Sequence, residues 1–301
     1  MIGLEDFVEH VIRTGLVSSR EVAEARASLK PAGGPESTIL LAQALIDRGL
    51  LTSYQARKIL AGATRGFILD GYRLLRPLGK GGMGQVFLAE APGGGGRVAV
   101  KVLPPRKAIE EENALKRFHR ERELSSRCSH PNLAKMLAEG SVGDIHYMVM
   151  EYIRGASLFE LVKSGQRGAL TVPDASRLFL KVLDGLEAAH SAGLIHRDIK
   201  PSNIMITPEG EPKILDLGLA RALGEEVALT RDNAVLGTLD YASPEQLSDA
   251  AKADRRSDLY SLGCTLYFVL AGRPPFDGGD MINKIFKQRM EDPEPLEQVA
   301  K

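Results

Sequence analysis

The chain has 301 residues, of which 44% are hydrophobic and 26% are charged, proportions that are typical of a globular protein. Lys and Arg total 39, as do Asp and Glu, so the formal net charge is zero and a basic nucleic-acid-binding surface is not expected. The longest apolar stretch, residues 259–271, is too short to span a bilayer, and the acidic N-terminus is unlike a signal peptide. Two widely separated cysteines, Cys128 and Cys264, favour a reducing, cytoplasmic location with free and buried thiols.

The first part of the chain, residues 1–66, has helical periodicity and contains an internal duplication. In each copy a glycine ends one helix, two apolar residues follow, and a hydroxyl with a later Glu or Gln forms a capping box: Gly15, Ser18 and Glu21, then Gly49, Thr52 and Gln55. A Pro/Gly-rich linker at 30–35 joins the copies. We expect a small helical domain, a duplicated helix-turn-helix, that either packs on its own chain or docks a partner protein.

From residue 72 the pattern changes to short strands around a glycine-rich turn. Residues 72–78 and 86–90 have strand character, and they flank the segment from Gly79 to Gly84. A GxGxxG pattern also occurs in dinucleotide-binding folds, but there a helix follows the glycines, whereas here a strand follows. Because glycines let the backbone close over phosphate groups, the sequence favours a phosphate-binding hairpin.

A lysine, Lys101, lies in the next apolar strand. An isolated lysine on a strand is usually a surface residue with a buried stem, but a glycine hairpin just upstream favours a cation that binds phosphates. A charged, helical stretch at 110–127 offers Glu121 and Glu123 as acidic partners for this lysine, and we choose Glu121. Another strand is expected at 145–150.

The most informative stretch is 194–206, where a polar loop lies between two apolar ends. Within it Asp198 can accept a proton, Lys200 can bind an anion, and Asn203 can bind a metal ion. A helix over 174–192 leads into this loop, with an expected apolar face of Leu178, Phe179, Val182, Leu183 and Leu186.

Taken in order, these motifs resemble those of bacterial, eukaryotic-like (Hanks-type) serine/threonine protein kinases. The matching segments are the glycine hairpin, Val-Ala-Val-Lys ending at Lys101, His-Arg-Asp-x-Lys-x-x-Asn at 196–203, Asp-Leu-Gly at 216–218 and Ser-Pro-Glu at 243–245. The resemblance implies an α+β, bilobal protein-kinase-like fold at 72–301, preceded by the all-α domain at 1–66. Its β-rich lobe would span 72–153 and its helical lobe 154–301.

Compared with that family, the helical lobe is expected to be incomplete at its C-terminus. Further helices are missing, as is the arginine that pairs with the glutamate of the Ser-Pro-Glu step, here Glu245. The alternative to an active kinase is therefore a catalytically silent or weak pseudokinase that acts as a scaffold. The intact Lys101, Asp198, Asn203 and Asp216 favour the active enzyme.

The resemblance also implies the chemistry: transfer of the γ-phosphate of ATP, with Mg²⁺, to protein hydroxyls. Its catalytic residues would be Asp198, Lys200, Lys101 and Glu121, and its Mg²⁺ ligands Asn203 and Asp216. Residues expected to contact ATP are Leu78, Gly79, Gly81, Gly84, Val86, Ala99, Lys101, Met150, Glu151, Ile153, Met205 and Leu215.

Regulation is expected through the segment 218–245. Arg197 would bind a phosphorylated residue, for which Thr230 is the candidate, while Asp232 would supply part of the negative charge. Thr238, with Lys200, indicates a serine or threonine acceptor, and Asp258 would anchor the loop backbone from beneath. Expected partners are protein substrates, a partner protein at residues 1–66 and a second copy of the chain, without nucleic acid or a membrane segment.

Overall fold

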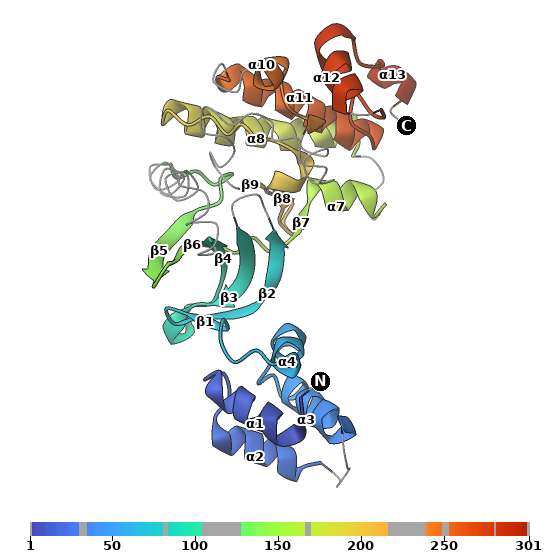
Figure 1. Ribbon diagram of the computed structural model, residues 1–301. Helices are drawn as coiled ribbons and strands as arrows, with labels where there is room; N and C mark the ends of the chain where they lie inside the picture. Colours follow the sequence, from blue (N-terminus) through green and yellow to red (C-terminus); the bar gives the residue numbers. More distant parts are fainter. Residues whose placement is uncertain are drawn as a thin grey trace. The chain divides into compact units, whose positions relative to one another are not determined.

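The computed structural model of the protein describes residues 2–29, 35–80, 84–103, 128–165, 170–215, 239–248, 253–279 and 281–299. Two compact units divide the chain between them (Figure 1). Unit 1 comprises Met1–Ala114 with Leu137–Tyr152, and unit 2 comprises Leu115–Met136 with Ile153–Lys301.

Unit 1 begins with a group of helices that share one apolar core. These helices are α1 (Leu4–Arg13), α2 (Ser19–Ala27), α3 (Pro35–Asp47) and α4 (Ser53–Leu60). Their buried faces meet in a cluster whose fully buried members include Phe7, Val11, Leu41, Leu45 and Ile59. These side chains recur at helical spacing, so burial of one stripe per helix accounts for the packing.

Both predicted capping boxes are present. Ser18 caps α2 together with Glu21, and Thr52 caps α4 together with Gln55. Each box satisfies backbone N–H groups that the first turn of a helix leaves without partners. Gly49, which ends α3, has a left-handed φ of 71°, the conformation expected for such a glycine.

The rest of unit 1 is an antiparallel sheet with the strand order β1-β2-β3-β4-β6-β5. Its strands are β1 (Ile68–Leu69), β2 (Tyr72–Lys80), β3 (Gln85–Glu90), β4 (Arg97–Leu103), β5 (Met136–Val142) and β6 (Ile145–Glu151), with a short 3₁₀ turn η1 (Pro92–Gly94). Because the strand β3 follows the glycine turn, the dinucleotide-binding alternative is excluded. One face of the sheet forms an apolar cluster with Phe87, Val100 and Val149.

Unit 2 is mainly helical. It contains β7 (Ala156–Ser157), α7 (Leu158–Lys163), α8 (Val172–Ser191), η2 (Pro201–Asn203), β8 (Ile204–Ile206), β9 (Pro212–Ile214), α10 (Pro244–Ser248), α11 (Arg255–Ala271), α12 (Met281–Met290) and α13 (Leu296–Val299). The strands form a small sheet in the order β7-β8-β9. A core between α8 and α11, which includes Val182, Leu186 and Phe268, supports the segment that joins α8 to η2.

The helix α8 differs from its prediction in two respects. It begins at Val172, earlier than expected, because Thr171 caps it and the following proline is tolerated in a first helical turn. The predicted apolar face is not buried over its whole width, since Leu183 is 37% exposed. The buried stripe instead passes through Phe179, Val182 and Leu186 and leaves Leu183 on its flank.

Both cysteines are buried and free, as predicted. Within the described part of the chain, no helix is at once long and apolar enough to cross a membrane.

Candidate active site

The polar loop between α8 and β8 brings three predicted site residues together. The Lys200 ammonium lies 2.8 Å from Asp198 Oδ2. The Asn203 amide nitrogen donates to the same oxygen and to the backbone carbonyl of Asp198, both at 2.9 Å. The short turn η2 carries Asn203 back toward Asp198, so that one carboxylate, one cation and one amide share a small volume.

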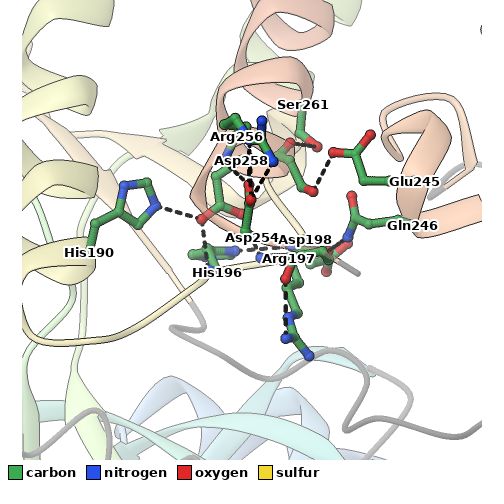
Figure 2. A network of polar contacts seen from close by, with 12 residues as sticks. His190, His196, Arg197, Asp198, Glu245, Gln246, Asp254, Arg256, Asp258 and Ser261 are labelled. Carbon is green, nitrogen blue, oxygen red and sulfur yellow. Dashed lines mark hydrogen bonds and ion pairs between the residues drawn. The ribbon is translucent and has the colours of Figure 1, made fainter. Parts of the chain in front are cut away.

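This loop is held in place by Asp258, the fourth residue of α11 (Figure 2). Asp258 is fully buried, and its carboxylate accepts the backbone N–H groups of His196 at 2.8 Å and Arg197 at 2.7 Å. The His190 ring Nε2 lies 2.8 Å from the same carboxylate. The predicted anchoring role of Asp258 is confirmed by these contacts.

Arg197 has an unusual backbone conformation, with a φ of 62° that non-glycine residues rarely adopt. Two side chains bind its backbone, one at the N–H group and one at the carbonyl group. Asp258 accepts its N–H, and the Gln246 side-chain amide donates to its carbonyl at 3.0 Å. These contacts stabilise the strained conformation of Arg197, the residue directly before Asp198.

A further contact joins the loop to the end of β9. Leu215 N–H donates to the Asn203 carbonyl at 2.8 Å, and the His196 ring Nε2 lies 2.8 Å from the Leu215 carbonyl. Leu215 is thus held on both of its peptide groups. Asp216, the second predicted metal ligand, comes next in the chain and lies outside the described residues.

Sequence reasoning missed the partners of the Ser-Pro-Glu step. Glu245, whose arginine partner in the family is missing here, accepts a hydrogen bond from Ser257 Oγ at 2.6 Å. Burial acts to raise the pKa of Glu245, but hydrogen bonds from Ser257, from the backbone and from Ser243 outweigh it, so the pKa is lowered. Gln246 was missed as well, although its spacing from Ser243 fits a capping box.

In unit 1 the strand register places several predicted ATP contacts on one face of the sheet. Val86 is opposite Lys101, and Ala99 is opposite Met150. Because side chains alternate along a strand, Ala99 and Lys101 point to the same side. This is the face opposite the apolar cluster that contains Phe87. Lys101 is only 4% exposed.

The glycine hairpin shows one position where only glycine fits. A Cβ added to Gly84 would lie 2.1 Å from the Val102 carbonyl oxygen, well inside any real contact. A side chain there would force β3 and β4 apart, so the need for Gly84 is already accounted for by strand packing. A Cβ on Gly79 would meet nothing within 4 Å.

The remaining predicted residues are distributed as follows. Leu78 and Glu151 belong to unit 1, while Ile153 and Met205 belong to unit 2. Outside the described residues lie Gly81, Glu121, Asp216, Thr230, Asp232 and Thr238. Among the residues that are described, no group of three or more His, Cys, Asp or Glu side chains could hold a metal ion.

Comparison with known proteins gives a consistent result. Residues 72–299 match the family model described as "Protein kinase domain". The chain is 40% identical over 233 residues to the probable serine/threonine-protein kinase PknB of Corynebacterium glutamicum. The aligned region covers 76% of this chain and 35% of the relative. It is 38% identical over 237 residues to the serine/threonine-protein kinase PknB of Mycobacterium tuberculosis, covering 77% of this chain and 37% of that one.

Solved structures give the same picture. A double mutant of the Mycobacterium tuberculosis PknI kinase domain superposes with a TM-score of 0.58 at 28% sequence identity, covering 78% of this chain and 83% of that one. The chain spans only about a third of the length of the curated relatives it matches, with 35% and 37% of the two PknB proteins covered.

Proposed function

The chain belongs to the protein kinase family, with bacterial serine/threonine-protein kinases among its relatives, and we propose that it transfers the γ-phosphate of ATP to serine or threonine hydroxyls of proteins. The family match and the structural likeness confirm the predicted α+β, protein-kinase-like fold class. The observation that carries the proposal is the cluster of Asp198, Lys200 and Asn203 on a loop anchored by buried Asp258.

In this proposal Asp198 accepts, or orients, the proton of the acceptor hydroxyl. Its contacts with Lys200 and Asn203 both use Oδ2, so we assign Oδ1 to the hydroxyl. A carboxylate held in this way attacks no substrate itself but aligns the oxygen that does. Lys200 places a positive charge beside Asp198, where it can stabilise the negative charge of the phosphate in transfer.

The donor set of the loop suits Mg²⁺. Among the described residues, the hydrogen bonds of the Asn203 side chain use its nitrogen, and its amide oxygen is a hard ligand of the kind Mg²⁺ prefers. Asp216 would supply the second ligand. Mg²⁺ held by these residues would neutralise charge on the phosphate groups. Asn203 would then have a double role, since its nitrogen donates to Asp198 while its oxygen would bind the metal.

For nucleotide binding we propose that Lys101 contacts the α- and β-phosphates, with Glu121 as its acidic partner. Gly79, Gly81 and Gly84 would let the backbone approach the phosphates. Backbone groups of Glu151 and Ile153 would bind the adenine edge, and apolar contacts would come from Leu78, Val86, Ala99, Met150, Met205 and Leu215. The shared sheet face of Val86, Ala99, Lys101 and Met150 supports the unit 1 part of this set.

We further propose regulation by phosphorylation of Thr230, with Arg197 as the residue that binds the phosphate and Thr238 near the acceptor. Asp232 would supply part of the charge before phosphorylation. Replacement of Asp232 by alanine should then lower the activity of the unphosphorylated protein, and unchanged activity would contradict this role. A cytoplasmic location, a partner protein at residues 1–66 and a homodimer stay predictions.

The experiment is transfer of labelled phosphate from Mg-ATP to the protein itself and to a generic basic protein substrate. Asp198→Asn should lower kcat by about 10²–10⁴-fold while ATP binding is retained. Phosphoamino-acid analysis should find phosphoserine or phosphothreonine. If the wild-type chain binds ATP but transfers no phosphate, the silent-scaffold alternative replaces this proposal.

A further inference from the structure

The helices of unit 1 are joined to the strand β2 by side-chain hydrogen bonds. Thr52 Oγ1 donates to the Leu75 carbonyl at 2.6 Å, and Gln55 Nε2 donates to the Leu74 carbonyl at 2.8 Å. In the opposite direction, the Arg73 guanidinium donates to the Leu50 carbonyl, just before α4. Gln55 is fully buried, so its amide has no access to water as an alternative partner.

The strand β2 needs these donors at this position. Its register against β3 shifts between Leu74 and Arg76, which leaves Leu75 as an extra residue of a β-bulge. On its other side β1 pairs only with Tyr72 and Arg73. A bulge interrupts the regular ladder, and the side chains of Thr52 and Gln55 donate to the two carbonyls at this point of β2.

Ring packing extends the same contact to β3. The Tyr54 and Phe87 rings lie 6.3 Å apart between centroids, at 55° to one another. Phe87 belongs to the sheet face opposite the one that carries Lys101. The helix α4 therefore contacts the sheet face opposite the predicted nucleotide-binding face.

The duplicated sequence provides an internal comparison. Ser18 and Glu21 form the same type of box at the start of α2, but the side-chain hydrogen bonds described for them stay within the box. A glutamate carboxylate can only accept, whereas a glutamine can accept with its oxygen and donate with its nitrogen. The second copy has Gln55 where the first has Glu21, and only the glutamine has the N–H donor that a hydrogen bond to the Leu74 carbonyl requires.

We propose that Thr52 and Gln55 are positioning residues of the nucleotide-binding lobe. By holding the bulge of β2, they fix the course of the strand into Gly79 and Lys80, the start of the proposed phosphate-binding hairpin. Residues 1–66 then act as a built-in brace of this lobe. The effect on ATP rests on the proposed kinase function, whereas the brace itself does not.

The test compares Gln55→Met and Thr52→Val with the matched changes Glu21→Met and Ser18→Ala, all in the full chain. Each pair removes the same capping function, but only the first two remove a donor to β2. Hydrogen exchange measured by mass spectrometry reports the opening of β2, with α8 as a reference in unit 2. Steady-state phosphate transfer gives KM for ATP and kcat separately.

Gln55→Met should speed exchange in β2 at least about fivefold and leave α8 unchanged, because a buried carbonyl loses its donor. KM for ATP should rise at least about threefold, with a smaller change in kcat, and the Glu21 and Ser18 variants should match wild type in both. Equal exchange in β2 for both sets, or a loss of kcat at constant KM, would overturn the proposal.

Two further controls keep the result decisive. If Gln55→Met does not fold, Thr52→Val and Thr52→Ser decide the question, because the serine keeps the hydroxyl that donates to Leu75 and should restore slow exchange. If the wild-type chain transfers no phosphate, the kinase proposal fails, but β2 exchange still decides whether residues 1–66 act as a brace.

Discussion

Two capping boxes, one in each unit, do more than begin a helix. At α4 the Gln55 side-chain oxygen accepts the Thr52 N–H at 2.8 Å while its nitrogen binds the Leu74 carbonyl. At α10 the Gln246 oxygen accepts the Ser243 N–H at 3.1 Å while its nitrogen binds the Arg197 carbonyl. Each glutamine thus caps the start of its own helix and also donates a hydrogen bond to a carbonyl in a distant, irregular segment.

The boxes at α2 and α7 are different because they contain glutamate. Glu21 and Glu160 accept hydrogen bonds from Ser18 and Ser157, and the side-chain contacts described for each box stay within it. Neither glutamate is buried, whereas Gln55 and Gln246 are. The comparison shows that the Glu or Gln three residues after the cap decides whether a helix start can also bind a distant carbonyl, since an amide both accepts and donates whereas a carboxylate only accepts.

The largest loss of stability is expected when Asp258 is changed, because its carboxylate and the Gln246 amide bind the same residue, Arg197. Asp258 binds the N–H side of Arg197 and Gln246 binds its carbonyl side. Asp258→Asn puts an amide nitrogen against backbone N–H groups in a fully buried site. We expect the free energy of unfolding, measured in urea, to fall by about 3 kcal/mol, and phosphate transfer to fall with it.

Asp254→Asn is the matched control on the same helix. Asp254 caps α11 by accepting the Arg256 N–H, and asparagine caps a helix about as well as aspartate. Its unfolding free energy should stay within about 0.5 kcal/mol of wild type. Equal losses in the two variants would mean that Asp258 acts only as one more helix-capping residue.

A smaller effect is expected when the donor is removed and the box is kept. Gln246→Glu preserves the acceptor for the Ser243 N–H but turns a carboxylate oxygen toward the Arg197 carbonyl. The free energy of unfolding should fall by about 1–3 kcal/mol. The reverse change, Glu160→Gln at α7, adds a donor at an exposed site. It should change the free energy of unfolding by less than about 0.5 kcal/mol.

Much of the fold could be predicted from local pattern. Alternation and periodicity identified β2, β3, β6 and most of the helix α8, and spacing alone identified the boxes at Ser18 and Thr52. The grouping of Asp198, Lys200 and Asn203 also follows from sequence, because all three lie in one short loop.

The contacts that connect distant segments were harder to predict. Nothing in the local pattern says that Gln55 reaches Leu74, that Gln246 reaches Arg197, or that Ser257 binds Glu245. The first two depend on the backbone carbonyls that a bulge and a strained turn present, and the third depends on how α10 and α11 pack; both are properties of the folded chain. Periodicity likewise predicts which face of α8 is apolar but not how much of that face is covered by other elements. Leu183 lies on this face and is still 37% exposed.

The smallest effect concerns pH and separates the glutamate box from the glutamine box. Hydrogen bonds from the Ser18 side chain and backbone lower the pKa of Glu21 from its ordinary 4.5, with Arg73 contributing in the same direction and burial opposing. The folded state therefore favours the carboxylate. Its contribution to stability is present above about pH 4.5 and is lost as the pH falls through the lowered pKa. Gln55 does not titrate, so the box at α4 should keep its strength.

Exchange of the Ser18 and Thr52 amides, followed by NMR from about pH 6 to about pH 3, measures the two boxes side by side. After correction for intrinsic rates, protection of Ser18 should fall at the acid end while that of Thr52 holds. Glu21→Gln should remove the pH dependence at Ser18 and leave Thr52 as it was. If both amides lose protection together, the loss reports acid unfolding of the whole unit, and the distinction between a box that only caps and a box that also anchors would not extend to their response to pH.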